Sequence, residues 1–269
     1  MFPLKDNIPL ARMPLVTIAL LALNVLAYLL SIRHGGSFFG GPDERVAVRY
    51  GAIPYELSHP GSHCILLAAP SAEASAGSVA CLPGSLTPEQ LGAAGPPSRP
   101  ATWATVFTSM FMHGSFLHLF GNMLFLAIFG PTVEDTIGRA RFTSFYLLGG
   151  IVALGAQVLI DPGSTVPTLG ASGAIAAVLG GYILICPRAR VLTLVFIIFF
   201  VTIVEVPAIA LLGFWFVVQL YLGLAGLASP VSEGGVAYFA HVGGFAFGLL
   251  TIRAFAGRRR AGRPALPVY

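Results

Sequence analysis

The chain has 269 residues, of which about 10% are charged, against roughly 25% in an ordinary soluble domain. Hydrophobic residues make up 56%. This composition excludes a soluble globule, a coiled coil and a disordered chain. The net charge of +4 comes from scattered arginines, not from the dense basic face of a nucleic-acid-binding domain. We therefore interpret the chain as a polytopic membrane protein with no nucleic-acid partner.

The apolar runs predict where the chain crosses the bilayer, since about 20 apolar residues span its core as a helix. The first run, Pro14–Ile32, is longer than the core of a signal peptide and is not followed promptly by a cleavage site. It is expected to be a retained anchor helix. The later runs are Gly114–Phe129, Phe142–Ile160, Leu169–Cys186, Val191–Leu227 and Val236–Phe255.

The run Val191–Leu227 is too long for one helix and is interrupted by Glu205 and Pro207. It could form two spans, or an interfacial piece followed by one span that starts near Val206. Charge favours the second reading, because a seventh span would place the five C-terminal arginines outside, against the positive-inside rule. With six spans and an internal N-terminus, most basic residues are cytoplasmic: Lys5, Arg12, Arg139, Arg141, Arg188, Arg190, Arg253, Arg258, Arg259, Arg260 and Arg263.

The predicted fold is thus an all-α membrane protein, a six-transmembrane helical bundle with a long external loop between helices 1 and 2. Its segments are a cytoplasmic N-terminus (1–13), helix 1 (14–32), the external loop (33–102), a core of helices 2–6 (103–256) and a basic cytoplasmic tail (257–269). The loop is rich in Gly, Pro, Ala and Ser, above all over 68–100, so its second half is expected to be partly flexible. Cys64 and Cys81 lie in it on the oxidising side, where they could form a disulfide or remain free thiols.

Three predicted spans carry polar residues, which are costly in a membrane and are functional candidates by default. From a rise of about 1.5 Å per residue, Ser172 in the fourth span and His241 in the sixth lie roughly 5 and 7 Å below the outer surface. His118 and Asn122, on one face of the second span, lie roughly 7 and 13 Å below His113. Serine, histidines and asparagine are therefore expected in one layer near the outer leaflet.

These residue types suit acyl transfer. Serine becomes a nucleophile when a neighbouring base, usually histidine, takes its proton. The Ser172 backbone N–H, with the side chains of His118 and Asn122, could stabilise the developing oxyanion. No Asp or Glu is predicted at that depth to orient His241, so the group would be a dyad. Each of these residues could instead serve helix packing alone, and Gly244 and Gly248 are typical of two helices in close contact.

The motifs resemble those of the rhomboid intramembrane serine proteases, in order and spacing, over about Trp103 to Phe255 and in Tyr50–Leu57. The resemblance implies Ser172 as nucleophile, His241 as general base, and His118, Asn122 and the Ser172 backbone in the oxyanion hole. It implies a cytoplasmic-side interfacial loop at Val191–Val204 and a lateral gate at the fifth span. In the family an aromatic residue often follows the serine by four positions, but this chain has Ala176 there. The matching residues with an implied structural role are His113, Glu134, Gly170, Gly173, Gly244 and Gly248, and Glu134 is expected to tie the cytoplasmic loop.

The resemblance also implies the partners: single-span membrane protein substrates cleaved near the external face, and the lipid bilayer. We expect no cofactor or metal, a location in a bacterial plasma (inner) membrane, and cytoplasmic termini. A zinc protease would need H-E-x-x-H, which is absent. The rivals are a non-catalytic, rhomboid-like helix-binding protein and a small-solute transporter with a proton path through His118, His241 and Glu205. The natural substrate and the oligomeric state are left open.

Overall fold

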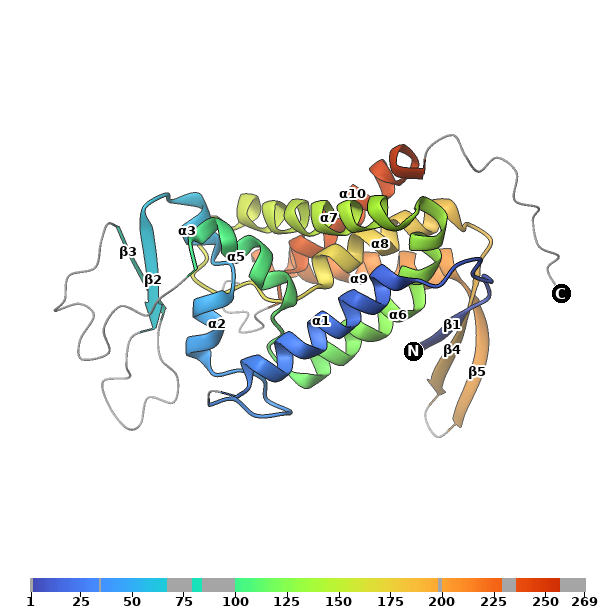
Figure 1. The fold of residues 1–269 in the computed structure, drawn as a ribbon, viewed down its shortest axis with the longest axis horizontal. Helices are drawn as coiled ribbons and strands as arrows, with labels where there is room; N and C mark the ends of the chain where they lie inside the picture. The colour runs from blue at the N-terminus through green and yellow to red at the C-terminus, as the bar shows by residue number, and fades with distance from the viewer. Residues whose placement is uncertain are drawn as a thin grey trace.

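The computed structural model describes residues 2–33, 35–66, 79–83, 100–197, 200–228 and 236–256. It is a bundle of helices with small β elements at its two ends (Figure 1). The predicted helical membrane architecture is confirmed. The long helices are α1 (Leu15–Ser31), α6 (Phe116–Ile137), α7 (Arg139–Ile160), α8 (Ser172–Ile185), α9 (Ala208–Ala228) and α10 (Tyr238–Ala256).

Four of these helices, α6, α7, α9 and α10, are long and apolar enough to cross a membrane. The helices α1 and α8 are also apolar but have 17 and 14 residues. Large apolar side chains are exposed along α1, α7 and α9, an arrangement that suits lipid and not water. The chain is thus an integral membrane protein, and the count of six spans stays a prediction.

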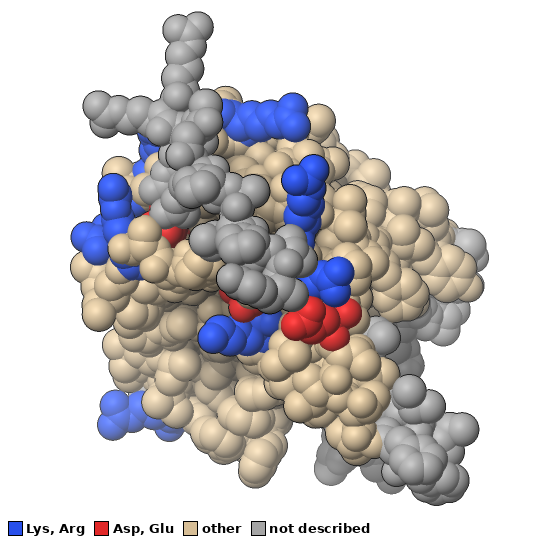
Figure 2. Space-filling model, turned by 90° about the vertical axis from the view of Figure 1, so that its right-hand side faces the viewer, with Lys and Arg blue, Asp and Glu red and all other residues tan. Residues whose placement is uncertain are grey.

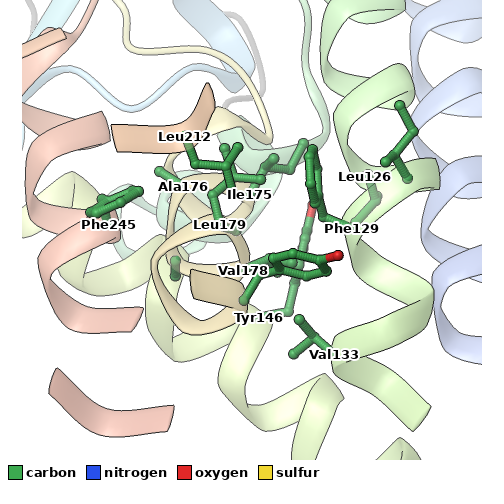
Figure 3. Packing of buried hydrophobic residues seen from close by; sticks show 14 of the residues in the cluster. Leu126, Phe129, Val133, Tyr146, Ile175, Ala176, Val178, Leu179, Leu212 and Phe245 are labelled. Atoms are coloured by element: carbon green, nitrogen blue, oxygen red, sulfur yellow. The ribbon is translucent and has the colours of Figure 1, made fainter. Parts of the chain in front are cut away.

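Helix α8 lies at the centre of the bundle. Nearly all its residues are buried, and α6, α7, α9 and α10 contribute the large side chains around it (Figure 3). Phe129 of α6 and Tyr182 of α8 meet edge to face, with ring centroids 4.9 Å apart. Helix α8 has small side chains at Ala174, Ala176 and Ala177, so the neighbouring helices approach its backbone closely.

The contact between α8 and α10 depends on glycines. A Cβ at Gly244 would overlap the carbonyl oxygen of Gly173, and one at Gly248 would overlap that of Ala177. Any larger side chain at either position would force the helices apart. Since Ser172 begins α8 and His241 lies in α10, this packing sets how closely those two residues approach.

The described elements between α1 and α6, within the loop predicted to be external, lie at one end of the molecule (left in Figure 1). The backbone of this part joins the loop before α8, because Ala52 and Thr168 form a β-bridge. The structure contains a disulfide between Cys64 and Cys81, which face each other in the β2–β3 hairpin. The segment 68–100, expected to be partly flexible, lies outside the described residues except for 79–83 and Pro100. The elements here are α2 (Glu44–Tyr50), α3 (Pro54–Ser58), β2 (Ser62–Leu66), β3 (Val79–Pro83) and α5 (Thr102–Thr108), followed by a 3-10 turn (Ser109–Phe111).

The opposite end carries an antiparallel sheet in the order β1-β4-β5, made of Phe2–Asp6, Arg190–Ile197 and Phe200–Pro207. The expectation of a loop over 191–204 is therefore corrected: its described residues form the antiparallel strands β4 and β5, and β4 also pairs with the N-terminal strand β1. Asp6 fixes the sheet to the bundle by accepting hydrogen bonds from Thr132 (2.7 Å) and Tyr182 (2.8 Å). Lys and Arg side chains gather on this end (Figure 2). The predicted basic tail, 257–269, lies outside the described residues.

Helix α6 extends eight residues beyond the apolar run that predicted it and includes Glu134. The Glu134 carboxylate accepts hydrogen bonds from the backbone N–H groups of Val16 (3.0 Å) and Thr17 (2.7 Å). These are first-turn donors of α1, which has no side-chain cap of its own. Glu134 was expected to tie the cytoplasmic loop. Its hydrogen bonds hold the start of α1 against α6, and its Oε1 atom lies 3.9 Å from the Nε atom of Arg139, the first residue of α7.

Candidate active site

Ser172 and His241 are in direct contact. The Nε2 atom of His241 lies 2.7 Å from the Oγ atom of Ser172. Ser172 is the first residue of α8, and His241 lies one turn into α10. Both side chains are partly buried. A serine hydroxyl at this distance can pass its proton to the imidazole.

The other ring nitrogen of His241 also has a partner. Its Nδ1 atom lies 2.7 Å from the Oε1 atom of Gln219 on α9. The ring of Trp215, one turn earlier on α9, lies 5.8 Å from the His241 ring, centroid to centroid. The side chain of Ala176 is buried in the core (Figure 3) and brings no ring to the site. Helix α9 therefore holds the imidazole from the side.

Sequence reasoning missed both Gln219 and Trp215. The signal for Gln219 was available: it is an amide within an otherwise apolar span, and such residues are costly in a membrane. For Trp215 the sequence offered no comparable signal, because aromatic residues are common in apolar helices.

A cavity of about 520 Å³ adjoins the two residues. Asn122 and His118 line it from α6, together with Ser172, His241 and Gln219. Asn122 is 8% exposed, and its Nδ2 group has no hydrogen-bond partner among the described residues. A buried N–H donor with no protein partner is available to a bound ligand. The four polar residues expected in one layer thus line one cavity.

Two of the four predicted structural glycines, Gly170 and Gly173, line this cavity. Gly170 has φ +123°, a conformation that favours glycine, and its N–H donates to the carbonyl oxygen of Ser109 (2.9 Å). Gly173 packs against α7, since a Cβ there would come within 2.6 Å of the Ala153 Cβ. Both glycines belong to the segment that presents Ser172.

His113 lies in the turn before α6 and is fully buried. Its Nδ1 atom lies 3.3 Å from the carbonyl oxygen of Phe111, and its ring meets the His118 ring edge to face at 5.1 Å. Burial, and to a lesser degree the neighbouring His118, lower the pKa of His113 to about 3. A neutral His113 can therefore support His118 from behind the cavity.

Among the described residues, no group of three His, Cys, Asp or Glu side chains lies close enough together to hold a metal ion. What the cavity offers is a hydroxyl on an imidazole, a free amide donor, a second imidazole and the start of a helix. The first N–H groups of a helix have no intrahelical partner, so they too can donate to an anion. This set is suited to acyl transfer through a serine nucleophile.

Comparison with known proteins matches the region that contains the site. The family described as Rhomboid domain matches residues 100–258. Rhomboid protein 1, mitochondrial, of Saccharomyces cerevisiae is 33% identical over 152 residues, which cover 54% of this chain and 40% of the relative. RHOMBOID-like protein 4 of Arabidopsis thaliana is 33% identical over 139 residues, 52% of this chain and 30% of the relative. Presenilin-associated rhomboid-like protein A, mitochondrial, of Danio rerio is 33% identical over 84 residues, 30% of this chain and 22% of the relative. Each match thus spans less than half of the relative's length.

Proposed function

Because the chain belongs to the rhomboid family of intramembrane proteases, we propose that it is an intramembrane serine endopeptidase with a Ser172–His241 dyad. One observation carries the proposal: the 2.7 Å contact between the Ser172 hydroxyl and the His241 Nε2 atom, beside a cavity with a free amide donor. A transporter needs no such pair. A helix-binding protein without activity would have no need of a serine held on a base.

In the first step the Ser172 oxygen attacks the carbonyl carbon of the scissile peptide bond, and His241 takes the hydroxyl proton at Nε2. The carbonyl oxygen becomes an oxyanion. The Asn122 amide, the His118 ring and the Ser172 backbone N–H stabilise that charge from fixed positions. The C–N bond then breaks, and His241 passes its proton to the leaving amine.

In the second step a water molecule attacks the ester that joins Ser172 to the substrate. His241 takes a proton from the water at Nε2, and the same donors hold the new oxyanion. The C–O bond to Ser172 breaks, and the serine oxygen regains the proton from His241. The products are two chains, one with a new carboxylate and one with a new amine.

The substrates we propose are single-span membrane proteins in the same bilayer. Helix α8 has 14 residues and is therefore about 21 Å long, shorter than the roughly 30 Å hydrocarbon core. In the proposed topology its first residue faces the external side. A bond that meets Ser172 is then one near the external end of the substrate's span. A bacterial plasma membrane, with both termini cytoplasmic, is the location that we propose.

The test is cleavage of a tagged single-span substrate by the purified protein in liposomes. The wild-type protein should cleave it, and Ser172→Ala should not. Alanine removes only the hydroxyl, so the thermal stability of the variant should match that of the wild type. Cleavage by the Ser172→Ala protein would refute the dyad. A wild-type protein that binds the substrate but never cuts it would support the non-catalytic alternative.

A further inference from the structure

Helix α9 contributes one polar amide to the bundle, and that amide contacts the base of the proposed dyad. Gln219 is the only Asn, Gln or charged residue in Ala208–Ala228. Its contact with His241 is the one side-chain hydrogen bond that joins α9 to another helix in the described part of the chain. A polar side chain kept in such a helix suggests a role beyond packing.

The contact with Gln219 bears on which ring nitrogen of the neutral His241 imidazole carries the proton. The partner of Nδ1 is the carbonyl oxygen of the Gln219 amide, at 2.7 Å. A carbonyl oxygen only accepts, so this arrangement assigns the N–H to Nδ1. In a neutral imidazole with the proton on Nδ1, Nε2 carries the lone pair. Nε2 is the atom that lies 2.7 Å from the Ser172 hydroxyl.

We propose that Gln219 is a positioning residue for His241, performing with a neutral amide the task that a carboxylate performs in a Ser-His-Asp triad. It holds the tautomer in which Nε2 can accept the serine proton, and it fixes the ring plane. The inference deepens the proposed function and rests on it. It revises the dyad predicted from the sequence to a Ser172–His241–Gln219 chain of hydrogen bonds.

The amide also makes the base depend on a second helix. His241 belongs to α10, which packs deeply against α8, whereas α9 is the least buried of the four long apolar helices. Trp215 and Gln219 lie one turn apart on α9, on the face that meets His241. Orientation of the base therefore requires α9 in its packed position.

The experiment separates hydrogen bonding from packing with two variants of similar size. Gln219→Met removes the acceptor, and Gln219→Glu keeps an acceptor on a stem of the same length. Tyr221→Phe is the matched control, because it removes a polar group from an exposed position two residues along α9. Gln219→Leu also replaces the amide by an apolar side chain, but by a branched one. Two rates are measured for each protein in liposomes: labelling of Ser172 by a fluorophosphonate, and cleavage of a single-span substrate.

Gln219→Met and Gln219→Leu should each lower the labelling rate and kcat by about tenfold or more, the scale of one lost neutral hydrogen bond, with KM nearly unchanged. Gln219→Glu should stay within about threefold of the wild type, since a carboxylate can also accept from Nδ1. Tyr221→Phe should behave as the wild type. Wild-type labelling by both apolar variants would overturn the inference. So would equal losses in Gln219→Glu and Gln219→Met, because the side chain would then act through its packing alone.

The same data distinguish failure of the inference from failure of the proposed function. If the wild type cleaves and is labelled while the Gln219 variants are unaffected, only the role of Gln219 falls. If the wild type is neither labelled nor active, Ser172 is not an activated nucleophile, and both proposals fall.

Discussion

The position that a Cβ would take at Gly170 lies against the imidazole of His118. A methyl group at position 170 would lie 2.7 Å from His118 Nε2 and 3.5 Å from Asn122 Nδ2. Gly170 thus leaves the space that the His118 ring occupies, two residues before the proposed nucleophile. Its positive φ adds a backbone reason for glycine at the same position.

Gly170→Ala should therefore lower kcat by at least about tenfold, because the new methyl displaces His118 from the oxyanion site. The measurement is steady-state cleavage of a single-span substrate in liposomes. Gly61→Ala is the control for backbone strain, since Gly61 also has positive φ (87°) but nothing within 4 Å of a Cβ. If the two variants lose activity equally, the effect at position 170 is strain and not contact with His118.

The oxyanion donors themselves give a second prediction. Loss of one donor typically lowers kcat by about 10²–10³. Two side chains and a backbone N–H share the task here. His118→Ala and Asn122→Ala should therefore each lower kcat by about 10² or less. Substrate binding should persist, as measured by co-purification with the Ser172→Ala forms. A variant that cuts at the wild-type rate would make that residue a packing element.

The site residues that could be predicted from the sequence differ in one physical respect from those that only the structure reveals. Ser172, His118, Asn122 and His241 were recognisable because helix rise converts sequence position into depth, and their depths agreed. Gln219 has no spacing relation to His241. Its contact depends on how α9 packs against α10, which periodicity does not reveal. The same holds for Glu134, which meets the start of α1 from more than 110 residues away.

The β-sheet was missed for a different reason. The segment that forms β4 and β5 is almost wholly apolar, so it lacks the alternation of polar and apolar residues that indicates a strand. Its many Val, Ile and Thr residues were the remaining signal for strands. The partner strand, Phe2–Asp6, lies far away in the sequence, since Phe2 pairs with Leu194, and local sequence does not encode such a contact.

The glycines between α8 and α10 give a prediction about stability. Gly248→Ala places a methyl group on the Ala177 carbonyl oxygen, so the helices must separate. Overpacking of this kind costs about 1–3 kcal/mol of unfolding free energy. The thermal midpoint in detergent should fall, and cleavage should fall with it because His241 moves with α10. Gly155→Ala, in α7 with nothing within 4 Å of its Cβ, should leave both unchanged or raise the midpoint, since Ala favours helix over Gly.

Orientation in the bilayer can be tested through the two ends of the molecule. Basic side chains gather at the end that carries the sheet (Figure 2), and basic residues are retained on the cytoplasmic side. A reporter fused after Tyr269 should be cytoplasmic, and one inserted near Ala76 should be external. A C-terminal reporter found outside would refute the proposed orientation and the external position of Ser172.

The position of Ser172 also predicts where a substrate is cut. A peptide bond within a regular helix is shielded by its own hydrogen bonds, so the substrate must unwind locally to reach the serine. Small or helix-breaking residues make unwinding easier, since Gly costs a helix about 1 kcal/mol relative to Ala. We therefore expect cleavage after a small residue near the external end of the substrate's span, with Gly or Pro just downstream.

Two substrate variants and one mapping experiment test this expectation. Replacing the downstream Gly or Pro by Leu should slow cleavage, because the helix then resists unwinding. Lengthening the cytoplasmic tail of the same substrate should have little effect, because that tail lies far from Ser172. Mass spectrometry of the products locates the cut. A cut in the half of the span nearest the cytoplasm would contradict the account, since a nucleophile at the external start of a 14-residue helix cannot reach a bond there without movement of α8 itself.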